Sequence, residues 1–541
     1  MDNYIVLNER DIFNLEMLLI GAFKPLTGFL REKDYNSVVE NMRISSGELW
    51  SIPITLSISE KNTEKFKNGD NIILKDEYGL SLAELINIEI YKPNLEKECK
   101  YVYSTNDDNH PSVNRILKNP NKYYIGGELK KISGINHYDF AEYRLTPDDV
   151  KNFYKENGWK TIVGFQTRNP MHRSHFELTK YALKMAGEDA KLLLNPVVGE
   201  TQNCDVDYYL RVKCYIKLLR HYPENGVKLC LLPLAMHMAG PREALMHAII
   251  RQNYGCTHFI IGRDHAGPSY KTKEGESFYG AYEAHDLVKI YEEELSIKII
   301  FAPHIVYVDD LKDYRLITDV EEGMKVLNIS GTEQRRMLEN GEDIPEWFTY
   351  PEIADELKKF YKPRHKQGFC IYLVGLSGSG KSTIAQYLYN KLREIDTRTI
   401  TILDGDVVRH NLSKGLGFSR EDRSTNVRRI GYFASEIVKH GGICICANIA
   451  PYEDDRQYNR MQIGRNYVEI YLNTKLEICE ERDIKGLYKL ARDGVIKEFT
   501  GISDVFEIPE NSELILDGSN YNNIEKNVDE IVKYLSKKSL V

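Results

Sequence analysis

The chain has 541 residues, of which 42% are hydrophobic and 28% charged, and its formal net charge is -8. This length exceeds one hydrophobic core and predicts three or four domains, while the acidic balance argues against a general nucleic-acid binder, so anionic substrates must be held by local Arg and Lys clusters. Because the N-terminus shows no signal-peptide pattern, no apolar run approaches the ~20 residues of a membrane span, and the nine cysteines include no C-x-x-C pair, we expect a cytoplasmic protein with no nucleic-acid or membrane partner.

Residues 1–145 contain short alternating apolar runs, such as SIPITLSI (51–58), which are broken by Gly, Asn and Asp. Alternation with a period of two predicts β-strands with one buried face. The segment therefore predicts a mainly β domain, with helical pieces near its start.

The pattern changes at residue 146. Thr146 is a predicted N-cap for a helix that stops at Gly158, and KTIVGF (160–165) then reads as a buried strand. Helical HRSHFELTKYALKMAG (172–187) follows, and strands and helices alternate up to THFIIGRD (257–264). Such alternation predicts a doubly wound parallel sheet whose ligands lie at the C-terminal ends of the strands.

Residues 312–361 are polar and predict mostly helix, and KPRHKQG (362–368) is a short basic segment that predicts a linker. The remaining residues, 369–541, again alternate strands with helices and have the size of a compact nucleoside-monophosphate-kinase-like domain.

The first polar cluster is GFQTRNPMHRSHFELTK (164–180), at a predicted strand-to-helix junction. His172 and His175 are three residues apart, so they lie on one face of the first helical turn. From spacing alone they are structural histidines, metal ligands or phosphate contacts. The neighbouring Gln166, Arg168 and Asn169 favour an anion site, since a guanidinium makes bidentate contacts to a tetrahedral oxyanion.

The second cluster, IIGRDHAGPSY (260–270), ends another buried strand with Arg263, Asp264 and His265. As a plain polar turn it would need no ligand. On one parallel sheet, however, two such strand ends can face each other across a crevice.

The third cluster, GLSGSGKS (375–382), lies between an apolar strand and a helix. The pattern G-x-x-x-x-G-K-[ST] in this context predicts a phosphate-binding loop, in which backbone N–H groups and Lys381 hold phosphates and Ser382 binds Mg²⁺.

Acceptor candidates follow the phosphate loop. Asp404 and Asp406 end a β-rich run, where a carboxylate orients Mg²⁺ or accepts a proton from a hydroxyl. Arg409 lies just beyond them. GFSREDRSTNVRRIG (417–431) gathers arginines around Phe418, which suits an anionic acceptor with a base to stack, or a solvated basic helix. Further on, Cys444 and Cys446 share one face of an apolar strand, which favours buried thiols over metal ligands.

Residues 1–361 resemble ATP sulfurylase (sulfate adenylyltransferase) of the single-chain type. The resemblance rests on the first two clusters and on GAFKPLTGFL (21–30), AGPREALMHAIIRQNYGCTHFIIGRDHAGP (239–268) and ISGTEQRRMLENGEDIPEWFTYPEI (329–353). It implies a PUA-like domain at 1–145, a HUP-type doubly wound nucleotidyltransferase domain at 146–311 and a small helical domain at 312–361.

The same resemblance implies site residues. The ATP contacts would be Gln166, Thr167, Arg168, Asn169, Gly262, Arg263, Asp264, His265 and Val306; the sulfate contacts would be Gln166, Arg168 and Ala266; the catalytic residues would be Thr167, Arg168, Asn169, His172, His175 and Arg263.

Residues 369–541 resemble adenylylsulfate (APS) kinase, through the phosphate loop, DGDVVRHNLSKGLGFSREDRSTNVRRIG (404–431), PYEDDRQYNR (451–460) and IKEFTGISDVFE (496–507). By this resemblance ATP would lie on Gly375, Leu376, Ser377, Gly378, Ser379, Gly380, Lys381 and Ser382. APS would contact Asp406, Arg409, Phe418, Arg423, Asn426, Lys485 and Leu487, with Asp406 also catalytic and Ser382 and Asp406 holding metal.

Four positions depart from these families. Ala450 stands where many kinases carry a serine linked to a phosphoserine intermediate, so we expect direct in-line transfer. Glu453 replaces a common Arg, and 503–507 differ from the usual lid segment, which predicts a looser lid. His237 replaces the Arg that precedes AGPREA, which predicts a weaker anion contact.

The sequence therefore predicts two consecutive transferase steps. ATP and sulfate would give adenylylsulfate and pyrophosphate, and the C-terminal domain would phosphorylate the 3′-hydroxyl of adenylylsulfate to give PAPS. We expect Mg²⁺ with ATP, no tightly bound organic cofactor, and a homo-oligomer. Three alternatives stay open: a C-terminal domain that only senses nucleotide, as in some fungal sulfurylases; a non-enzymatic ATP-binding scaffold; and a sulfurylase that runs in reverse and makes ATP from adenylylsulfate.

Overall fold

A computed structural model describes residues 3–202, 205–483 and 485–541. The chain divides into two compact units. One comprises Met1–Gln334 and Ile344–Phe360, and the other comprises Arg335–Asp343 and Tyr361–Val541. The division passes through helix α11 (Gly331–Asn340), and the finer boundaries predicted at 145 and 311 stay predictions.

A six-stranded mixed sheet forms the N-terminal part of the first unit, with strand order β1-β4-β5-β6-β2 and β3 paired to β6. Its strands are β1 (Tyr4–Val6), β2 (Gly28–Phe29), β3 (Leu56–Ile58), β4 (Ile72–Lys75), β5 (Ser81–Tyr91) and β6 (Tyr123–Lys131). Its helices are α1 (Glu9–Leu19), α2 (Glu32–Asn41), α3 (Glu60–Lys65), α4 (Leu95–Val102) and α5 (Pro111–Lys118). In β4, Ile72 and Leu74 are fully buried while their neighbours are not, as the alternating pattern predicted.

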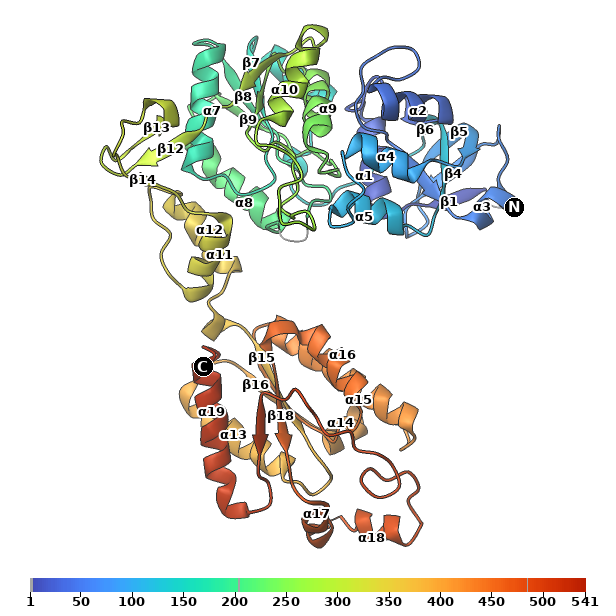
Figure 1. The fold of residues 1–541 in the computed structure, drawn as a ribbon, viewed down its shortest axis with the longest axis vertical. Helices are drawn as coiled ribbons and strands as arrows, with labels where there is room; N and C mark the ends of the chain where they lie inside the picture. The colour runs from blue at the N-terminus through green and yellow to red at the C-terminus, as the bar shows by residue number, and fades with distance from the viewer. Residues whose placement is uncertain (1–2, 203–204, 484) are drawn as a thin grey trace. The chain divides into compact units, whose positions relative to one another are not determined.

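The next part holds a five-stranded parallel sheet in the order β11-β10-β7-β8-β9. Its strands are β7 (Ile162–Phe165), β8 (Lys191–Leu194), β9 (Val227–Leu229), β10 (His258–Ile261) and β11 (Lys298–Phe301). Its helices are α6 (Pro147–Glu156), α7 (Arg173–Ala186), α8 (Tyr208–Leu218), α9 (Gly240–Asn253) and α10 (Glu283–Tyr291). Figure 1 shows α7 and α8 on one side of these strands and α9 and α10 on the other. The predicted doubly wound sheet is confirmed.

Local sequence signals account for these boundaries. Thr146 caps α6 through a reciprocal capping box with Asp149, and α7 ends at Gly187, which adopts a positive φ of 128°. Both ends lie where the N-cap and glycine patterns placed them.

The prediction of mostly helix for 312–361 is wrong in its first half. Residues of this half form β13 (Asp313–Leu316) and β14 (Val326–Leu327), which pair with β12 (Ile305–Val308) in a small antiparallel sheet. A short hairpin explains it, since Asp309–Lys312 reverses the chain and the Tyr307 ring of β12 packs edge-to-face with Tyr314 of β13. Only α11 (Gly331–Asn340) and α12 (Pro351–Phe360) are helical.

The second unit contains another five-stranded parallel sheet, in the order β16-β17-β15-β18-β19. Its strands are β15 (Phe369–Val374), β16 (Ile400–Asp404), β17 (Ile443–Ala447), β18 (Tyr467–Leu472) and β19 (Leu514–Leu516). Its helices are α13 (Lys381–Ile395), α14 (Gly405–Asn411), α15 (Arg420–Lys439), α16 (Glu453–Ile463), α17 (Leu476–Arg482), α18 (Leu487–Arg492) and α19 (Ile524–Lys537).

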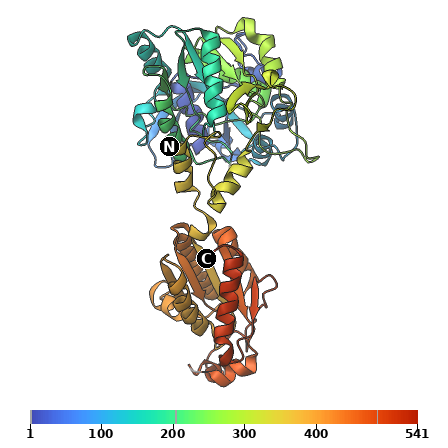
Figure 2. The same ribbon diagram turned by 90° about the vertical axis from the view of Figure 1, so that its left-hand side faces the viewer.

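Two apolar layers cover this second sheet. Helices α13 and α19 pack on one face, through residues such as Leu388 and Ile531, and α14, α15 and α16 cover the other face, where Val427 and Ile430 are buried. In the turned view α19 lies in front of the sheet (Figure 2). None of the described helices combines the length and apolar character needed to cross a bilayer.

Candidate active sites

The first site lies where the strand order of the first parallel sheet reverses. The chain runs outward through β7, β8 and β9 and then returns to β10 on the other side of β7, with Phe259 of β10 paired to Gly164 of β7. Residues 166–169 follow β7, and residues 262–265 follow β10. The two sequence clusters therefore flank a topological switch point, which is where such sheets bind ligands.

Arg168 is the cation of this crevice. Its Nη2 donates to the Gly267 carbonyl at 3.2 Å, its Nη1 lies 2.8 Å from the Met238 sulfur, and its Nε lies 3.8 Å from the Asp205 carboxylate. A carbonyl and a thioether are weak partners for a guanidinium, so an oxyanion would compete well for it. A cavity of about 290 Å³ opens here, and the predicted residues in its lining are Arg168, Asp264 and His265.

The loop that carries Arg168 is fastened from behind. The Arg211 guanidinium donates to the Arg168 carbonyl at 2.7 Å, and the Tyr215 hydroxyl donates to the Asn169 carbonyl at 2.7 Å. Both side chains come from α8, and both are buried. The Thr167 hydroxyl also donates to the Asn169 carbonyl, at 3.0 Å. These contacts fix the loop backbone that presents the Arg168 side chain.

His172 and His175 open helix α7. His172 is the N-cap, and its backbone N–H donates to Nδ1 of His175 at 3.2 Å. Burial lowers the pKa of His172 to about 3 and that of His175 to about 4. Both rings are therefore neutral near pH 7, and His175 keeps its proton on Nε2, available for donation to an anion.

A buried hydrogen-bond chain connects the two strand ends. The Arg251 guanidinium donates to Oε1 of Gln166, whose Nε2 lies 3.2 Å from Nε2 of His247. Nδ1 of His247 lies 3.0 Å from Nε2 of His265. Nε2 of His247 also lies 3.4 Å from the Glu243 carboxylate, so polar partners hold this ring at both of its nitrogens. Glu243, also buried, accepts from the backbone N–H groups of His237 and Ala239 at 2.9 Å.

The loop after β10 is strained and partly exposed. Asp264 and Ala266 adopt positive φ angles of 52° and 56°, which is costly for non-glycine residues and is concentrated at functional sites. Arg263 is exposed and its Nε donates to Asp264 at 3.2 Å. Gly262 follows β10 directly, and Val306 lies buried on β12, outside the cavity lining.

Sequence reasoning missed four of the supporting residues: Arg211, Tyr215, His247 and Arg251. A signal for the last two was present, because MHAIIRQNYG (246–255) places a His and an Arg in an otherwise apolar helix. His247 and Arg251 are fully buried, and a buried charge requires a specific partner.

The second site follows β15, whose neighbours β17 and β18 lie on its two sides. Gly375, Gly378 and Gly380 of the phosphate loop have φ angles of 154°, 75° and 102°. Lys381 Nζ donates to the carbonyls of Gly375 at 2.9 Å and Leu376 at 2.7 Å, and burial lowers its pKa to about 8. The lysine closes the loop on itself, on carbonyls that a bound phosphate would replace.

Oxygen ligands gather at the end of this loop. The Ser382 hydroxyl donates to the Asp404 carboxylate at 2.6 Å, and the other oxygen of Asp404 caps α14 by accepting from Asp406 N–H at 3.0 Å. The Asp406 carboxylate itself forms an ion pair with Lys485. Hydroxyl and carboxylate oxygens are the donors that Mg²⁺ prefers, so this set fits the metal expected with ATP.

The predicted acceptor residues surround the same sheet end. Arg409 packs 4.4 Å from the ring centroid of Phe418, which is 54% exposed and offers a free face. Arg423 is buried and bound to Asp504, to Thr500 and to the Glu498 carbonyl. Asn426 is buried with its Oδ1 lacking a partner, and Leu487 begins α18.

The divergent segment 503–507 is tied to the sheet. Asp504 accepts from the Tyr452 hydroxyl at 2.7 Å, Glu507 accepts from Glu453 N–H at 2.7 Å, and Phe506 stacks on Tyr471 with centroids 5.9 Å apart. These contacts fasten the segment at three points. The looser lid stays a prediction.

Sequence comparisons match the three parts in order. The PUA-like domain family matches residues 2–134, the ATP-sulfurylase family residues 141–360, and the adenylylsulphate kinase family residues 367–517. The sulfate adenylyltransferase of Aspergillus fumigatus is 44% identical over 521 residues, covering 95% of this chain and 90% of its own length. That of Gibberella zeae is 43% identical over 542 residues, covering 99% and 94%.

A structural comparison gives the same architecture. The hexameric APS kinase from Thiobacillus denitrificans superposes with a TM-score of 0.79 at 30% identity, covering all of this chain and 94% of that one. The chain belongs to the sulfate adenylyltransferase family and carries an adenylylsulfate kinase domain. Its two enzymatic activities are those of sulfate activation, to adenylylsulfate and then to PAPS.

Proposed function

We propose that the residues of the two strand-end sites divide the reaction as the sequence predicted, with transfer of the adenylyl group at β7 and β10 and phosphorylation at β15. The supporting observation is that each anion-binding cluster lies at the switch point of its own parallel sheet. Each site also holds a cation that donates to a backbone carbonyl which an oxyanion can replace: Arg168 donates to Gly267, and Lys381 donates to Gly375.

In the first step a sulfate oxygen attacks the α-phosphorus of ATP and pyrophosphate leaves. Negative charge builds up on the α-phosphoryl oxygens and on the leaving group, so oriented donors lower the barrier. Arg168, with Gln166 and the backbone of Ala266, would hold sulfate. His172 and His175 would donate N–H groups to the phosphates as neutral rings, and Arg263 would add its exposed charge. These groups need no covalent intermediate.

Nucleotide binding in the first site would use the two loops together. Thr167 and Asn169 lie on the fastened loop after β7, and Gly262, Asp264 and His265 on the strained loop after β10. Val306 would contact the adenine. The chain from Arg251 through Gln166 and His247 would hold the His265 ring in one orientation during the reaction.

In the second step the phosphate loop and Lys381 would hold ATP, and Asp406 would accept the proton of the 3′-hydroxyl of adenylylsulfate. Phe418 would stack on the base of the acceptor and Arg409 would contact its anionic groups, with Asn426 and Leu487 beside it. Lys485, paired with Asp406, is placed to exchange that partner for a phosphate. Arg423 would act by holding the segment that includes Asp504 in place.

Magnesium fits the residues at this second site. Ser382 and Asp404, with Asp406 close by along the chain, would hold it. When bound with ATP, Mg²⁺ neutralises charge shared between the β- and γ-phosphates. The protein's own part is to keep the serine hydroxyl and the carboxylates converged at the end of β16.

Coupling explains why both activities share a chain. The anhydride in adenylylsulfate is high in energy, so the first equilibrium lies toward ATP and sulfate. A kinase that consumes adenylylsulfate draws that equilibrium forward. We further propose a multifunctional cytoplasmic homo-oligomer, a proposal supported by the hexameric state of the Thiobacillus denitrificans relative.

The test is an incubation of the full chain with ATP, Mg²⁺, sulfate and pyrophosphatase, with adenylylsulfate and PAPS resolved by chromatography. We expect PAPS as the end product. Adenylylsulfate alone would support a nucleotide-sensing C-terminal domain, and neither product would support a scaffold. The intact loop residues Gly375, Gly380, Lys381 and Ser382 favour an active kinase over the sensing domain.

A further inference from the structure

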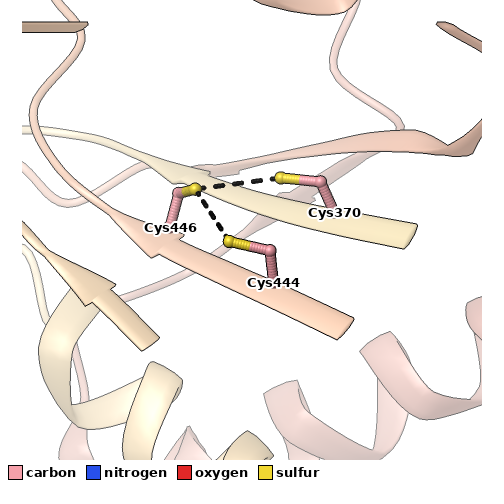
Figure 3. Close-up of side chains that lie close together, drawn as sticks. All are labelled: Cys370, Cys444 and Cys446. Atoms are coloured by element: carbon pink, nitrogen blue, oxygen red, sulfur yellow. Dashed lines mark hydrogen bonds between the residues drawn. The ribbon is translucent and has the colours of Figure 1, made fainter. Parts of the chain in front are cut away.

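Three cysteine side chains meet inside the kinase domain, away from the nucleotide site residues. Cys370 lies on β15, and Cys444 and Cys446 lie on the neighbouring β17, with Cys370 directly opposite Cys444 in the parallel register. Residues two apart on a strand share a face, so all three thiols point to the same side of the sheet. Figure 3 shows the three sulfurs turned toward one another.

The sulfurs have the spacing of a three-coordinate centre. The Cys446 sulfur lies 3.8 Å from that of Cys370 and 3.7 Å from that of Cys444, and all three lie within 4.8 Å of one another. An atom bonded to three sulfurs at about 2.3 Å holds them roughly 4 Å apart when planar, and closer when pyramidal. A disulfide would need sulfurs about 2.0 Å apart and would leave one thiol over.

The surroundings supply no fourth ligand among the described residues of this apolar cluster. The three thiols are fully buried, and their neighbours include Val427, Ile430 and Ala434. The Tyr372 hydroxyl accepts from the Asn448 and Asn459 amides, and the Tyr467 hydroxyl donates to Glu469. Structural zinc sites are almost always four-coordinate, so this arrangement disfavours zinc.

Charge selects among the remaining soft centres. Three thiolates around a monovalent ion carry a net charge of -2, and around a divalent ion a net charge of -1. Burying such a charge among aliphatic side chains without a counter-ion is costly. A trivalent centre with three thiolates is neutral, and burying it incurs no such penalty.

We propose that Cys370, Cys444 and Cys446 form a binding site for trivalent arsenic, taken up as arsenous acid. Each thiol sulfur forms one As–S bond while one As–O bond breaks, and the thiol proton leaves with the released hydroxide as water. Three thiols and one As(OH)₃ thus give one As(SR)₃ and three waters. The oxidation state of arsenic does not change, and no oxidant or reductant is needed.

The position of the site gives it a place in the enzyme. β15 ends at Val374 and continues directly into the phosphate loop, and β17 continues into the segment that contains Ala450. A centre bonded to both strands joins the two elements whose C-terminal ends carry the kinase chemistry.

The experiment uses the reduced full-length chain with arsenous acid as the probe. The chain is incubated for increasing times up to a day, freed of excess reagent by gel filtration, and its arsenic counted by mass spectrometry. We expect one arsenic per chain at this site and an arsenic X-ray absorption spectrum with three sulfur neighbours. Cys446→Val should lose this arsenic, whereas Cys479→Val, a matched change at another buried cysteine of the same domain, should keep it.

Folding of both variants is checked by circular dichroism, and Cys444→Ala serves as a second test if Cys446→Val is unfolded. Several results would overturn the proposal: wild-type chain that retains no arsenic at any time, equal retention by the Cys446 and Cys479 variants, or a spectrum with two sulfurs and one oxygen. Preferential retention of zinc or copper(I) offered in competition would contradict the charge argument and overturn it as well.

Discussion

The two proposed anion sites of this chain hold their binding groups in different ways. The kinase site is contiguous in sequence: one loop, residues 375–382, supplies the backbone donors, the lysine and the serine. The sulfurylase site is assembled from side chains that are far apart in sequence, such as Arg168, Met238 and Gly267. A local cradle depends on glycine backbone geometry, whereas an assembled one depends on how well its loops are held.

The resting states of the two cations sharpen this difference. Lys381 is buried and donates to two carbonyls of its own loop, and its pKa falls to about 8. Arg168 is partly exposed to the cavity and reaches across to another loop. The kinase cation is therefore held where burial disfavours its charged form. The sulfurylase cation instead bridges two loops. Substitutions should separate the two designs.

The largest effect is expected for Lys381→Met. Removing the charge that we propose binds the transferred phosphate should lower PAPS formation by about 10³-fold or more, since one oriented donor accounts for about 10²–10³. Adenylylsulfate synthesis should stay within a few-fold, because the lysine belongs to the second unit alone. Both activities are measured on one preparation, and a comparable loss of both would show that the two sites do not work independently.

The same variant tests the burial of the lysine charge. The pKa of Lys381 is about 8 in the folded chain, against its ordinary value of 10.5, so between these values the folded chain binds fewer protons than the unfolded chain. Wild-type stability should therefore rise with pH from 8 to 10.5. Without nucleotide, Lys381→Met should be the more stable chain at pH 7, by on the order of 1 kcal/mol or more, and the gap should shrink as pH rises through this window. A gap that widens would contradict the assignment.

Next in size is Arg168→Ala. It should lower adenylylsulfate synthesis by at least about 10²-fold, because it removes the donor that we propose for sulfate. PAPS formation from supplied adenylylsulfate should persist and serves as the internal control. His175→Ala should behave in the same way. Near-normal adenylylsulfate synthesis in both variants would remove these residues from the site.

Asp406→Asn addresses the acceptor side of the local site. The kinase rate should fall by about 10²-fold if Asp406 accepts the hydroxyl proton, which is the lower range for general bases. ATP affinity should survive, because the phosphate loop is untouched. Asp404→Asn is the matched comparison. Because Asp404 contacts Ser382, its loss should instead raise the Mg²⁺ concentration needed for half-maximal rate. Unchanged turnover in Asp406→Asn would assign the base elsewhere.

Sequence patterns predicted the contiguous site far better than the assembled one. The phosphate loop and the strand ends at 165 and 261 follow from local apolar runs and glycines. The partners of Arg168 do not follow from local patterns. The Met238 sulfur and the Gly267 carbonyl belong to residues 70 and 99 positions further along the chain. The strands within 313–327 were missed because the sequence of a short polar hairpin resembles that of a loop or a helix. The contact between Tyr307 and Tyr314, which stabilises the strand pairing, cannot be read from the local pattern. Tertiary contact decides such segments.

A smaller effect is expected from the buried chain behind the assembled site. His247→Gln should lower kcat for adenylylsulfate synthesis by about tenfold. The change removes the hydrogen bond between His247 and His265, and one hydrogen bond between neutral groups contributes about 1 kcal/mol. KM for ATP should change less than kcat, because His247 lies behind the cavity and does not line it. A large change in KM with kcat unchanged would assign the chain to binding rather than to orientation of His265. The intact kinase activity again reports correct folding of the second unit.

The smallest effect is expected at Ala450, where the local site lacks the serine that related kinases carry. Ala450 is buried, its φ is 44°, and its carbonyl accepts from Arg456 at 2.8 Å. A hydroxyl there would be enclosed with Tyr372 and Val374 rather than presented to a phosphate. Ala450→Ser should therefore leave PAPS turnover within about twofold and cost about 1 kcal/mol of stability.

Direct transfer is the reason for that expectation, and it can be tested on the wild-type chain without adenylylsulfate. Rapid mixing with γ-labelled ATP followed by denaturation should leave no protein-bound label, while PAPS turnover remains complete. Stoichiometric label that a chase removes would show a phosphorylated residue other than Ala450. Lys381 and Asp406 would then serve a covalent step, and the local cradle would differ from the assembled one, for which no covalent intermediate is proposed.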